Sequence, residues 1–192
     1  IRRDKLTALA EAGADPFLET KFDQRNWSED IKAGFEELEN QDVSIAGRIM
    51  SKRGMGKAIF ADVSDRKGRI QIYVRLNVGD EAFQAFRKVD IGDIIGVKGF
   101  VFRTKMGEIT VHAKEIKLLS KSLRPLPEKY HGLTNTELKY RQRYVDLIMN
   151  PETRRVFEIR SKFISFVRSY LDSRGFMEVE TPVLNTIMGG AT

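Results

Sequence analysis

Between residues 42 and 119, hydrophobic residues recur at every second position in short runs, and turn residues separate the runs. A period of two places successive side chains on opposite faces of an extended chain, so each run predicts a strand with one apolar face. The pattern predicts five strands, whose apolar positions lie within 43–49, 59–63, 70–74, 95–101 and 109–113. The centre of the chain is therefore expected to be a small β structure.

A short helix is expected at 81–88, between the third and fourth strands, where Ala82, Phe83 and Phe86 share one helical face. Five short strands with a single helix at this place are the plan of an OB-fold barrel. The predicted fold class is therefore mainly β with flanking helices, built around a five-stranded OB-fold barrel.

Helical periodicity flanks the barrel on both sides. Apolar residues at helical spacing predict one helix over 2–12 and another over about 28–38. Beyond the barrel, the same spacing predicts a helix at about 137–149 and a long helix at about 151–174, which Gly175 is placed to end.

Three turn-forming residues, Pro125, Pro127 and Gly132, separate the last helices from the barrel and indicate a linker. The predicted domains are an N-terminal helical extension at 1–41, the barrel at 42–119, the linker at 120–136 and the incomplete start of a second domain at 137–192. The chain begins with Ile1 and not with Met, so we expect it to be the front section of a longer protein.

The formal net charge of +6 is concentrated in the middle of the chain. Residues 42–119 carry 15 basic and 9 acidic side chains, and residues 120–174 carry 12 and 6, whereas both ends are acidic. Basic segments of this kind are typical of proteins that bind a polyanion such as nucleic acid. A mildly basic surface without any such partner is the alternative.

Several kinds of function are excluded or disfavoured by composition. The absence of Cys excludes disulfides, thiolate metal sites and cysteine nucleophiles. Neither His112 nor His131 has a second ligand nearby in the sequence, so no metal site is expected. No run approaches 18 apolar residues, and we expect a soluble, cytoplasmic protein without membrane contact.

The alternation also defines the outward face of the barrel. If the apolar positions point inward, their neighbours point outward, and these include Arg48, Phe60, Arg69, Gln71, Tyr73, Glu108, Thr110 and His112. An aromatic ring on the solvent side suits the stacking of a nucleic-acid base. Gln71 can read a base edge, and Glu108 can accept a hydrogen bond from a base N–H, which is sequence reading and not charge attraction.

The pattern alone leaves a second interpretation equally open. Phe60 can instead be covered by the N-terminal helices, with Gln71 and Glu108 merely solvated. Arg53, beside a glycine-rich turn, is either a phosphate contact or an ordinary solvated side chain. The residues by themselves support binding and show no chemistry, since no phosphate loop, dinucleotide fingerprint or Ser/His/Asp set occurs.

The segment Arg174–Pro182 resembles motif 1 of the class II aminoacyl-tRNA synthetases, in which a long helix is followed by Gly-aromatic and a strand that ends at Thr-Pro. An OB barrel ahead of this motif is similar to the aspartyl, asparaginyl and lysyl subgroup. Two stretches favour the lysyl members: Leu123–Leu133 resembles their linker, and Tyr140–Ile148 resembles the beginning of their catalytic domain. The Arg3–Leu6 and Gly13–Pro16 segments match their N-terminal helix as well.

This resemblance implies the ATP- and Mg²⁺-dependent charging of tRNA(Lys) with lysine by a homodimer whose barrel binds the anticodon. Phe60 matches the stacking aromatic residue, and Gln71 and Glu108 match the residues that read the central uridine. The remaining matches are the basic anticodon contacts Arg53 and Arg48, the motif 1 dimer interface at Gly175, Phe176 and Pro182, and the border of the lysine pocket at Gly189, Gly190 and Ala191.

Motifs 2 and 3 of the class are absent from the sequence, so we expect no catalytic residue in this chain and no activity from it alone. Two alternatives remain. An aspartyl or asparaginyl synthetase would share the barrel and motif 1 but should lack the Arg-Pro-Leu-Pro linker. A stand-alone OB-fold module would bind RNA without catalysis.

Overall fold

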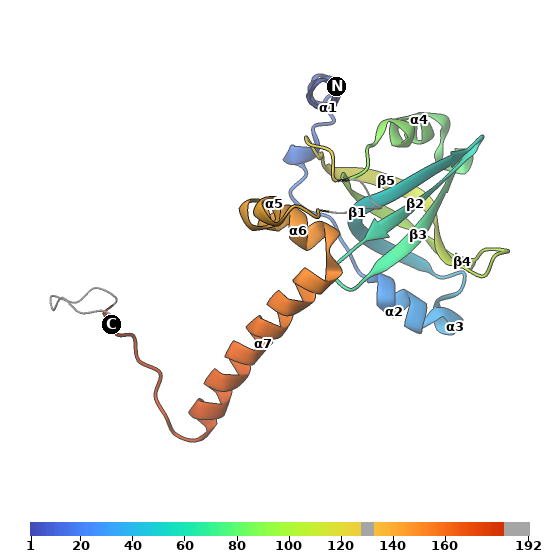
Figure 1. Cartoon of the computed structure of the whole chain (residues 1–192). Coiled ribbons are helices and arrows are strands. Elements are labelled where there is room, and N and C mark those ends of the chain that lie inside the picture. Colours follow the sequence, from blue (N-terminus) through green and yellow to red (C-terminus); the bar gives the residue numbers. More distant parts are fainter. Residues whose placement is uncertain (128–132, 183–192) are drawn as a thin grey trace. The chain divides into compact units, whose positions relative to one another are not determined.

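All five predicted strands are present and close into a barrel (Figure 1). The computed structural model describes residues 1–127 and 133–182. The strands are β1 (Asp42–Met55), β2 (Ala58–Ser64), β3 (Arg69–Arg75), β4 (Ile94–Arg103) and β5 (Ile109–Ser120). Their order around the barrel is β1-β2-β3-β5-β4, in which β3 and β5 pair in parallel and every other pair is antiparallel. The predicted OB-fold barrel is confirmed.

The barrel interior is filled by the apolar face that the alternation predicted. The β-branched side chains of Ile49, Val63, Ile72, Val97 and Val111 are almost completely buried there. Branched side chains pack well on a pleated surface and lose little rotamer freedom, which favours strands at these positions. Each strand is therefore held in register because a shift by one residue would expose its apolar set.

A β-bulge in β1 changes which residues of that strand face outward. The register with β2 shifts between Ile49 and Ser51, so that Arg53, and not its neighbour Lys52, lies on the same side as Phe60. A bulge adds one residue to one strand and reverses the side-chain alternation beyond it. Simple alternation along β1 did not predict this reversal.

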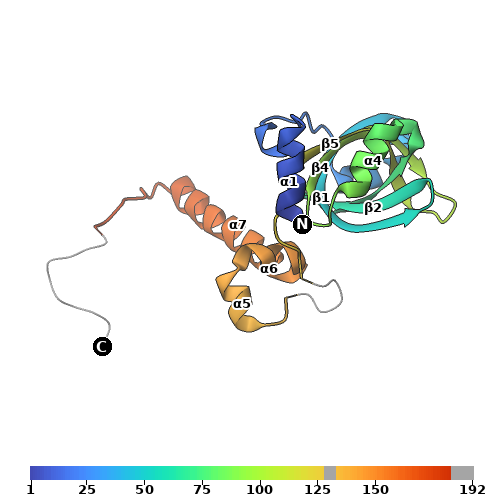
Figure 2. The same ribbon diagram turned by 90° about the horizontal axis from the view of Figure 1, so that it is seen from above.

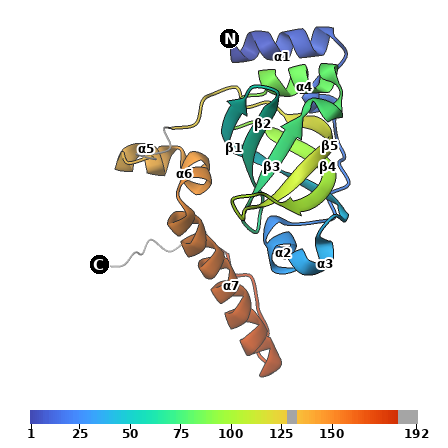
Figure 3. The same cartoon turned by 90° about the vertical axis from the view of Figure 1, so that its right-hand side faces the viewer.

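Helices cover both ends of the barrel. α4 (Asp80–Lys88) lies across one end and buries Phe83 and Phe86 in the core (Figures 1 and 2). α2 (Ser28–Ala33) and α3 (Phe35–Leu38) cover the other end with Ile31 and Phe35 (Figure 3). The apolar interior of the barrel is thus covered by helices at both ends.

The expected helix over 28–38 is interrupted at Gly34, which ends α2 and precedes α3. Glycine lowers the stability of a helix interior, and here the chain changes direction. The first turn of α2 is stabilised by a residue outside the helix: Asp65 accepts hydrogen bonds from the Ser28 backbone N–H (2.6 Å) and hydroxyl (2.8 Å). Asp65 therefore caps α2 in place of a side chain at the helix start.

The N-terminal helix is attached to the barrel through polar contacts. α1 (Arg2–Glu11) agrees with the predicted 2–12 helix and has no buried side chain within the described structure. Its Lys5 Nζ donates to Asp90 (2.6 Å) and to the carbonyl of Lys88 (3.1 Å). Two short 3₁₀ helices are also present: η1 (Pro16–Leu18) follows α1, and η2 (Leu76–Val78) lies between β3 and α4.

The chain divides into two compact units, Ile1–Leu126 and Pro127–Thr192. The second unit contains α5 (Thr136–Arg141), α6 (Arg143–Met149) and α7 (Pro151–Ser173). The predicted 137–149 helix is broken at Gln142 into α5 and α6. α7 ends at Ser173, and Gly175, just beyond the C-cap Arg174, has a φ of 82° that is accessible to glycine at little cost, as predicted for a helix C-terminus.

Candidate nucleic-acid interface

Five rings form a continuous aromatic face on the outer wall of the barrel. They are Phe60 on β2, Tyr73 on β3, Phe100 and Phe102 on β4, and His112 on β5. Neighbouring rings lie with centroids 4.8 to 6.3 Å apart, and all five are half-buried. We call these five residues the aromatic face.

The strand register explains why the rings meet. Phe60 pairs with Tyr73 across β2 and β3, Tyr73 pairs with His112 across β3 and β5, and His112 pairs with Phe100 across β5 and β4. Paired residues on one face of a sheet have Cβ atoms about 5 Å apart, which is ring-contact distance. Four strands therefore contribute one row of rings, with Phe102 beside it.

Two members of this face were not singled out from the sequence. Phe100 and Phe102 alternate with the inward residues Gly99 and Val101, so the same period of two marks them as outward. Lys114 lies over the Phe100 ring, with Nζ 5.5 Å from the centroid. A cation above the ring adds positive charge beside the aromatic surface.

Gln71 and Glu108 are brought together through a third residue. The hydroxyl of Thr110 lies 3.1 Å from Gln71 Oε1 and 3.3 Å from the backbone carbonyl of Glu108. Gln71 is two residues from Tyr73 and is therefore the diagonal neighbour of Phe60 on the β2–β3 pair. The Glu108 side chain is exposed at the start of β5. Gln71 is thus a neighbour of the predicted stacking residue Phe60, and Glu108 is linked to Gln71 through Thr110.

Thr110 itself corrects one expectation. It lies on the outward side of the ladder, opposite Gln71 and Phe102, yet it is completely buried. A threonine hydroxyl can be buried at little cost when it is hydrogen-bonded, and here two acceptors, Gln71 Oε1 and the Glu108 carbonyl, lie within reach of its one proton. Thr110 is therefore part of the support under the site and not part of its exposed surface.

The two predicted basic contacts are placed differently. Arg53 is exposed and pairs with Phe60 across β1 and β2, so it lies beside the aromatic face. Arg48 is half-buried, and its Nη1 donates to the carbonyl of Gly92 at 2.7 Å. Burial lowers the pKa of Arg48, although the Asp93 carboxylate opposes that shift. The Arg48 guanidinium would have to leave this contact in order to reach a phosphate.

His112 is unusual within the aromatic face. Its Nε2 is buried and has no hydrogen-bond partner among the described residues. Burial lowers the pKa of His112, and the positive charges of Arg75 and Lys114 lower it further. The imidazole is therefore neutral at physiological pH and acts as an aromatic ring.

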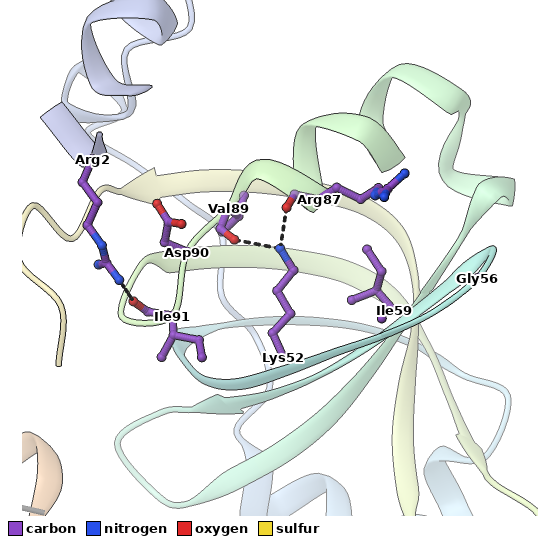
Figure 4. A pocket seen from close by; sticks show the side chains of 9 residues that line it. Arg2, Lys52, Gly56, Ile59, Arg87, Val89, Asp90 and Ile91 are labelled. Atoms are coloured by element: carbon purple, nitrogen blue, oxygen red, sulfur yellow. Dashed lines mark hydrogen bonds between the residues drawn. The ribbon is translucent and has the colours of Figure 1, made fainter. Parts of the chain in front are cut away.

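A separate cleft of about 650 Å³ lies near the C-terminal end of α4 (Figure 4). Two of the three cations that line it, Lys52 and Arg2, are already engaged by backbone carbonyls. Lys52 Nζ donates to Arg87 (3.0 Å) and Val89 (2.7 Å), and Arg2 donates to Ile91 (3.1 Å). The cleft is thus a less suitable anion site than the aromatic face beside Arg53.

Sequence families describe the same two parts of the chain. Residues 43–119 match the family described as OB-fold nucleic acid binding domain. Residues 135–192 match the family described as tRNA synthetases class II (D, K and N). The whole chain is similar to lysine–tRNA ligases.

The lysine–tRNA ligase of Pelotomaculum thermopropionicum is 58% identical to the chain over 192 residues. Those of Thermoanaerobacter pseudethanolicus and Clostridium perfringens are 56% and 50% identical. Each match covers 100% of this chain and 38% of the relative, so the chain spans well under half the length of these curated relatives. The resemblance to lysyl-tRNA synthetases is confirmed.

The motif 1 residues lie at the end of α7. Phe176 borders a hollow of about 430 Å³ together with Phe163, Val167 and Leu171 of α7. Phe176 is 64% exposed, and Pro182 is exposed in the segment that follows. The apolar side chains along α7, such as Val156, Ile159 and Phe166, are likewise exposed. Gly189, Gly190, Ala191 and His131 lie outside the described residues.

The described residues contain no cluster of side chains that could hold a metal ion. Across 1–127 and 133–182, no group of three or more His, Asp or Glu side chains is arranged to hold a cation. In that same part of the chain, no helix is long and apolar enough to cross a bilayer.

Proposed function

We propose that the barrel binds the anticodon of tRNA(Lys) as the anticodon-binding domain of a lysine–tRNA ligase. The observation that carries the proposal is that Arg53 pairs with Phe60, that Gln71 is the diagonal neighbour of Phe60, and that Thr110 links Gln71 to the backbone of Glu108. A flat ring, a donor, an acceptor and a cation are what recognition of one unstacked base requires.

In this proposal the central uracil stacks on Phe60. The Gln71 amide N–H donates to a uracil carbonyl oxygen, and the Glu108 carboxylate accepts from the uracil N3–H. Cytosine has an unprotonated N3 and an amino group in place of one carbonyl, so it would leave these side chains unpaired. Unpaired buried polar groups cost binding energy, and selectivity follows from that cost.

Basic side chains near the aromatic face are proposed to strengthen RNA binding without distinguishing one base from another. Arg53 is proposed to neutralise a phosphate beside the stacked base, and Lys114 and Arg75 add to the positive field at the far end of the aromatic face. Arg48 stays a prediction, because its guanidinium is held by Gly92.

The enzymatic reaction is proposed for the longer protein. There, lysine would be activated with ATP and then transferred to tRNA(Lys), with Mg²⁺ stabilising the phosphate charges. This chain is expected to be inactive alone. Homodimerisation through α7, Gly175, Phe176 and Pro182, the lysine pocket border at Gly189, Gly190 and Ala191, and a cytoplasmic location remain predictions.

The test is the affinity of the 192-residue chain for a fluorescent anticodon stem-loop of tRNA(Lys). The proposal predicts saturable binding that weakens when the central uridine is replaced by cytidine. Equal affinity for both stem-loops would indicate a sequence-neutral RNA-binding module instead. The anticodons of tRNA(Asp) and tRNA(Asn) share the central uridine but begin with guanosine. Weaker binding of their stem-loops than of the tRNA(Lys) stem-loop would therefore distinguish a lysyl-tRNA synthetase barrel from an aspartyl or asparaginyl one.

A further inference from the structure

Thr110 connects the two side chains that are proposed to read the base. It lies on β5, pairs with Gln71 in the parallel β3–β5 register and is 0% exposed. Its hydroxyl reaches both Gln71 Oε1 and the backbone carbonyl of Glu108. No solvent competes for this hydroxyl, so its hydrogen bond is a fixed feature of the folded barrel.

A threonine hydroxyl has one proton to donate. The 3.1 Å distance to Gln71 Oε1 is shorter than the 3.3 Å distance to the Glu108 carbonyl, which already accepts from the Thr104 backbone N–H at 2.9 Å. The hydroxyl proton of Thr110 is therefore assigned to the hydrogen bond with Gln71 Oε1. A glutamine amide can also be flipped by 180°. A flipped Gln71 would donate from Nε2 to Thr110 Oγ1 and would require the hydroxyl proton to turn to the more distant Glu108 carbonyl, so donation from Thr110 favours the orientation with Oε1 toward Thr110.

The opposite end of the amide then presents its nitrogen. Among the described residues, no hydrogen bond is made by Gln71 Nε2, so both of its protons remain for a ligand. In this orientation Gln71 offers a donor and no acceptor. It matches a uracil carbonyl and does not match the amino group of cytosine.

We infer that Thr110 is a positioning residue that sets the base selectivity of the barrel by fixing the Gln71 amide as a donor. The inference rests on the proposed function. Without the Thr110 hydroxyl, the amide can flip and accept a hydrogen bond from a cytosine amino group. The loss of Thr110 should therefore relax selectivity more than it weakens binding of the correct base.

The experiment compares the wild type with Thr110→Val and Thr110→Ser by measuring Kd for stem-loops with a central uridine or cytidine. Valine keeps the branched shape and removes the hydroxyl, whereas serine keeps the hydroxyl. A hydrogen bond of ordinary strength predicts that Thr110→Val reduces the cytidine-to-uridine Kd ratio by about fivefold. Thr110→Ser should retain the wild-type ratio.

The Gln71→Ala variant is the control that tests whether Thr110 acts on selectivity through Gln71. Thr110→Val should change the ratio no further once Gln71 is absent. An unchanged ratio in Thr110→Val, beside a lost ratio in Gln71→Ala, overturns the inference and leaves the proposed function standing. A wild type without preference overturns the proposed function and the inference with it.

A measurement on the wild type covers the case in which Thr110→Val does not fold. A hydrogen-bonded, buried hydroxyl proton exchanges slowly and is visible by NMR. The inference predicts a Thr110 hydroxyl signal with a nuclear Overhauser contact to the Gln71 side chain. A Gln71 amide that averages between both orientations contradicts it.

Discussion

Phe60 and Tyr73 contact each other across the β2–β3 pair, with their ring centroids 4.8 Å apart and their planes inclined by 39°. Tyr73 in turn contacts His112 at 5.0 Å, so that Phe60 is the end member of a connected row of rings. Phe60 is also the ring that pairs with Arg53, and it is a diagonal neighbour of Gln71. This position makes it the residue whose removal should affect a stacked base most.

Replacing Phe60 by Ala should weaken binding of the tRNA(Lys) anticodon stem-loop by about 1–3 kcal/mol, the usual contribution of one base–aromatic stack. Phe60→Tyr, which keeps a flat ring, should bind within a few-fold of the wild type. Stability should change little, since Phe60 lies outside the barrel core. A variant that fails to fold would show that Phe60 is a structural residue.

Salt should weaken the same complex. The logarithm of the association constant is expected to fall linearly with the logarithm of salt concentration, since phosphate contacts release counterions. Arg53→Gln should reduce the magnitude of that slope by about 1. Arg48→Gln should leave the slope nearly unchanged, because Arg48 is bound to Gly92. A slope that Arg53→Gln does not alter would argue against a phosphate contact.

Lys121 is buried in a cluster of carboxylates beside the end of β5. Its Nζ lies 2.8 Å from Asp93 and 2.6 Å from Asp90, and the Lys121 and Asp93 side chains are 1% and 0% exposed. Removing one member of a buried pair leaves an uncompensated charge, so Lys121→Met should lower the free energy of unfolding by about 3–5 kcal/mol.

The matched control for Lys121 is Lys98, whose pair with Glu115 has both side chains about half-exposed. Lys98→Met should cost at most about 1 kcal/mol, as exposed ion pairs contribute little. Urea denaturation of the two variants measures both values. Equal losses would contradict the buried character of the Lys121 pair.

Lys52 should make stability depend on pH in the alkaline range. Burial lowers its pKa from 10.5 to about 8, although the Asp90 carboxylate opposes the shift. Between these values the unfolded chain binds the proton more often than the folded protein does, so the free energy of unfolding gains a contribution that rises with pH. Lys52→Met should remove this contribution. Parallel pH profiles for Lys52→Met and wild type would contradict it.

Much of the barrel was predictable because its strands obey a simple rule. Residues such as Ile72 and Val111 alternate with polar neighbours, and burial of one face leaves only one register. The bulge at Ile49/Ser51 and the break at Gly34 were not predicted, since they depend on how β1 and α2 fit their neighbours in space. Alternation describes a regular strand and contains no information about its interruptions.

The candidate site was predictable in part for the same reason. Gln71, Phe60 and Glu108 were found on the outward face by alternation, and the motif resemblance gave them roles that remain predictions. The burial of Thr110 and the contact of Arg48 with Gly92 could not be predicted, because each depends on side chains that are distant in sequence. Phe100 and Phe102, in contrast, could have been predicted from the alternation along β4 and were overlooked.

The central claim is that the outer wall carrying the aromatic face binds the anticodon. The most direct measurement is an NMR titration of the ¹⁵N-labelled chain with the tRNA(Lys) anticodon stem-loop. The account predicts that the largest shifts occur at Phe60, Gln71, Tyr73 and Glu108, together with the Gln71 side-chain amide. Shifts that gather instead around Lys52 and Arg87, at the cleft beside α4, would contradict it.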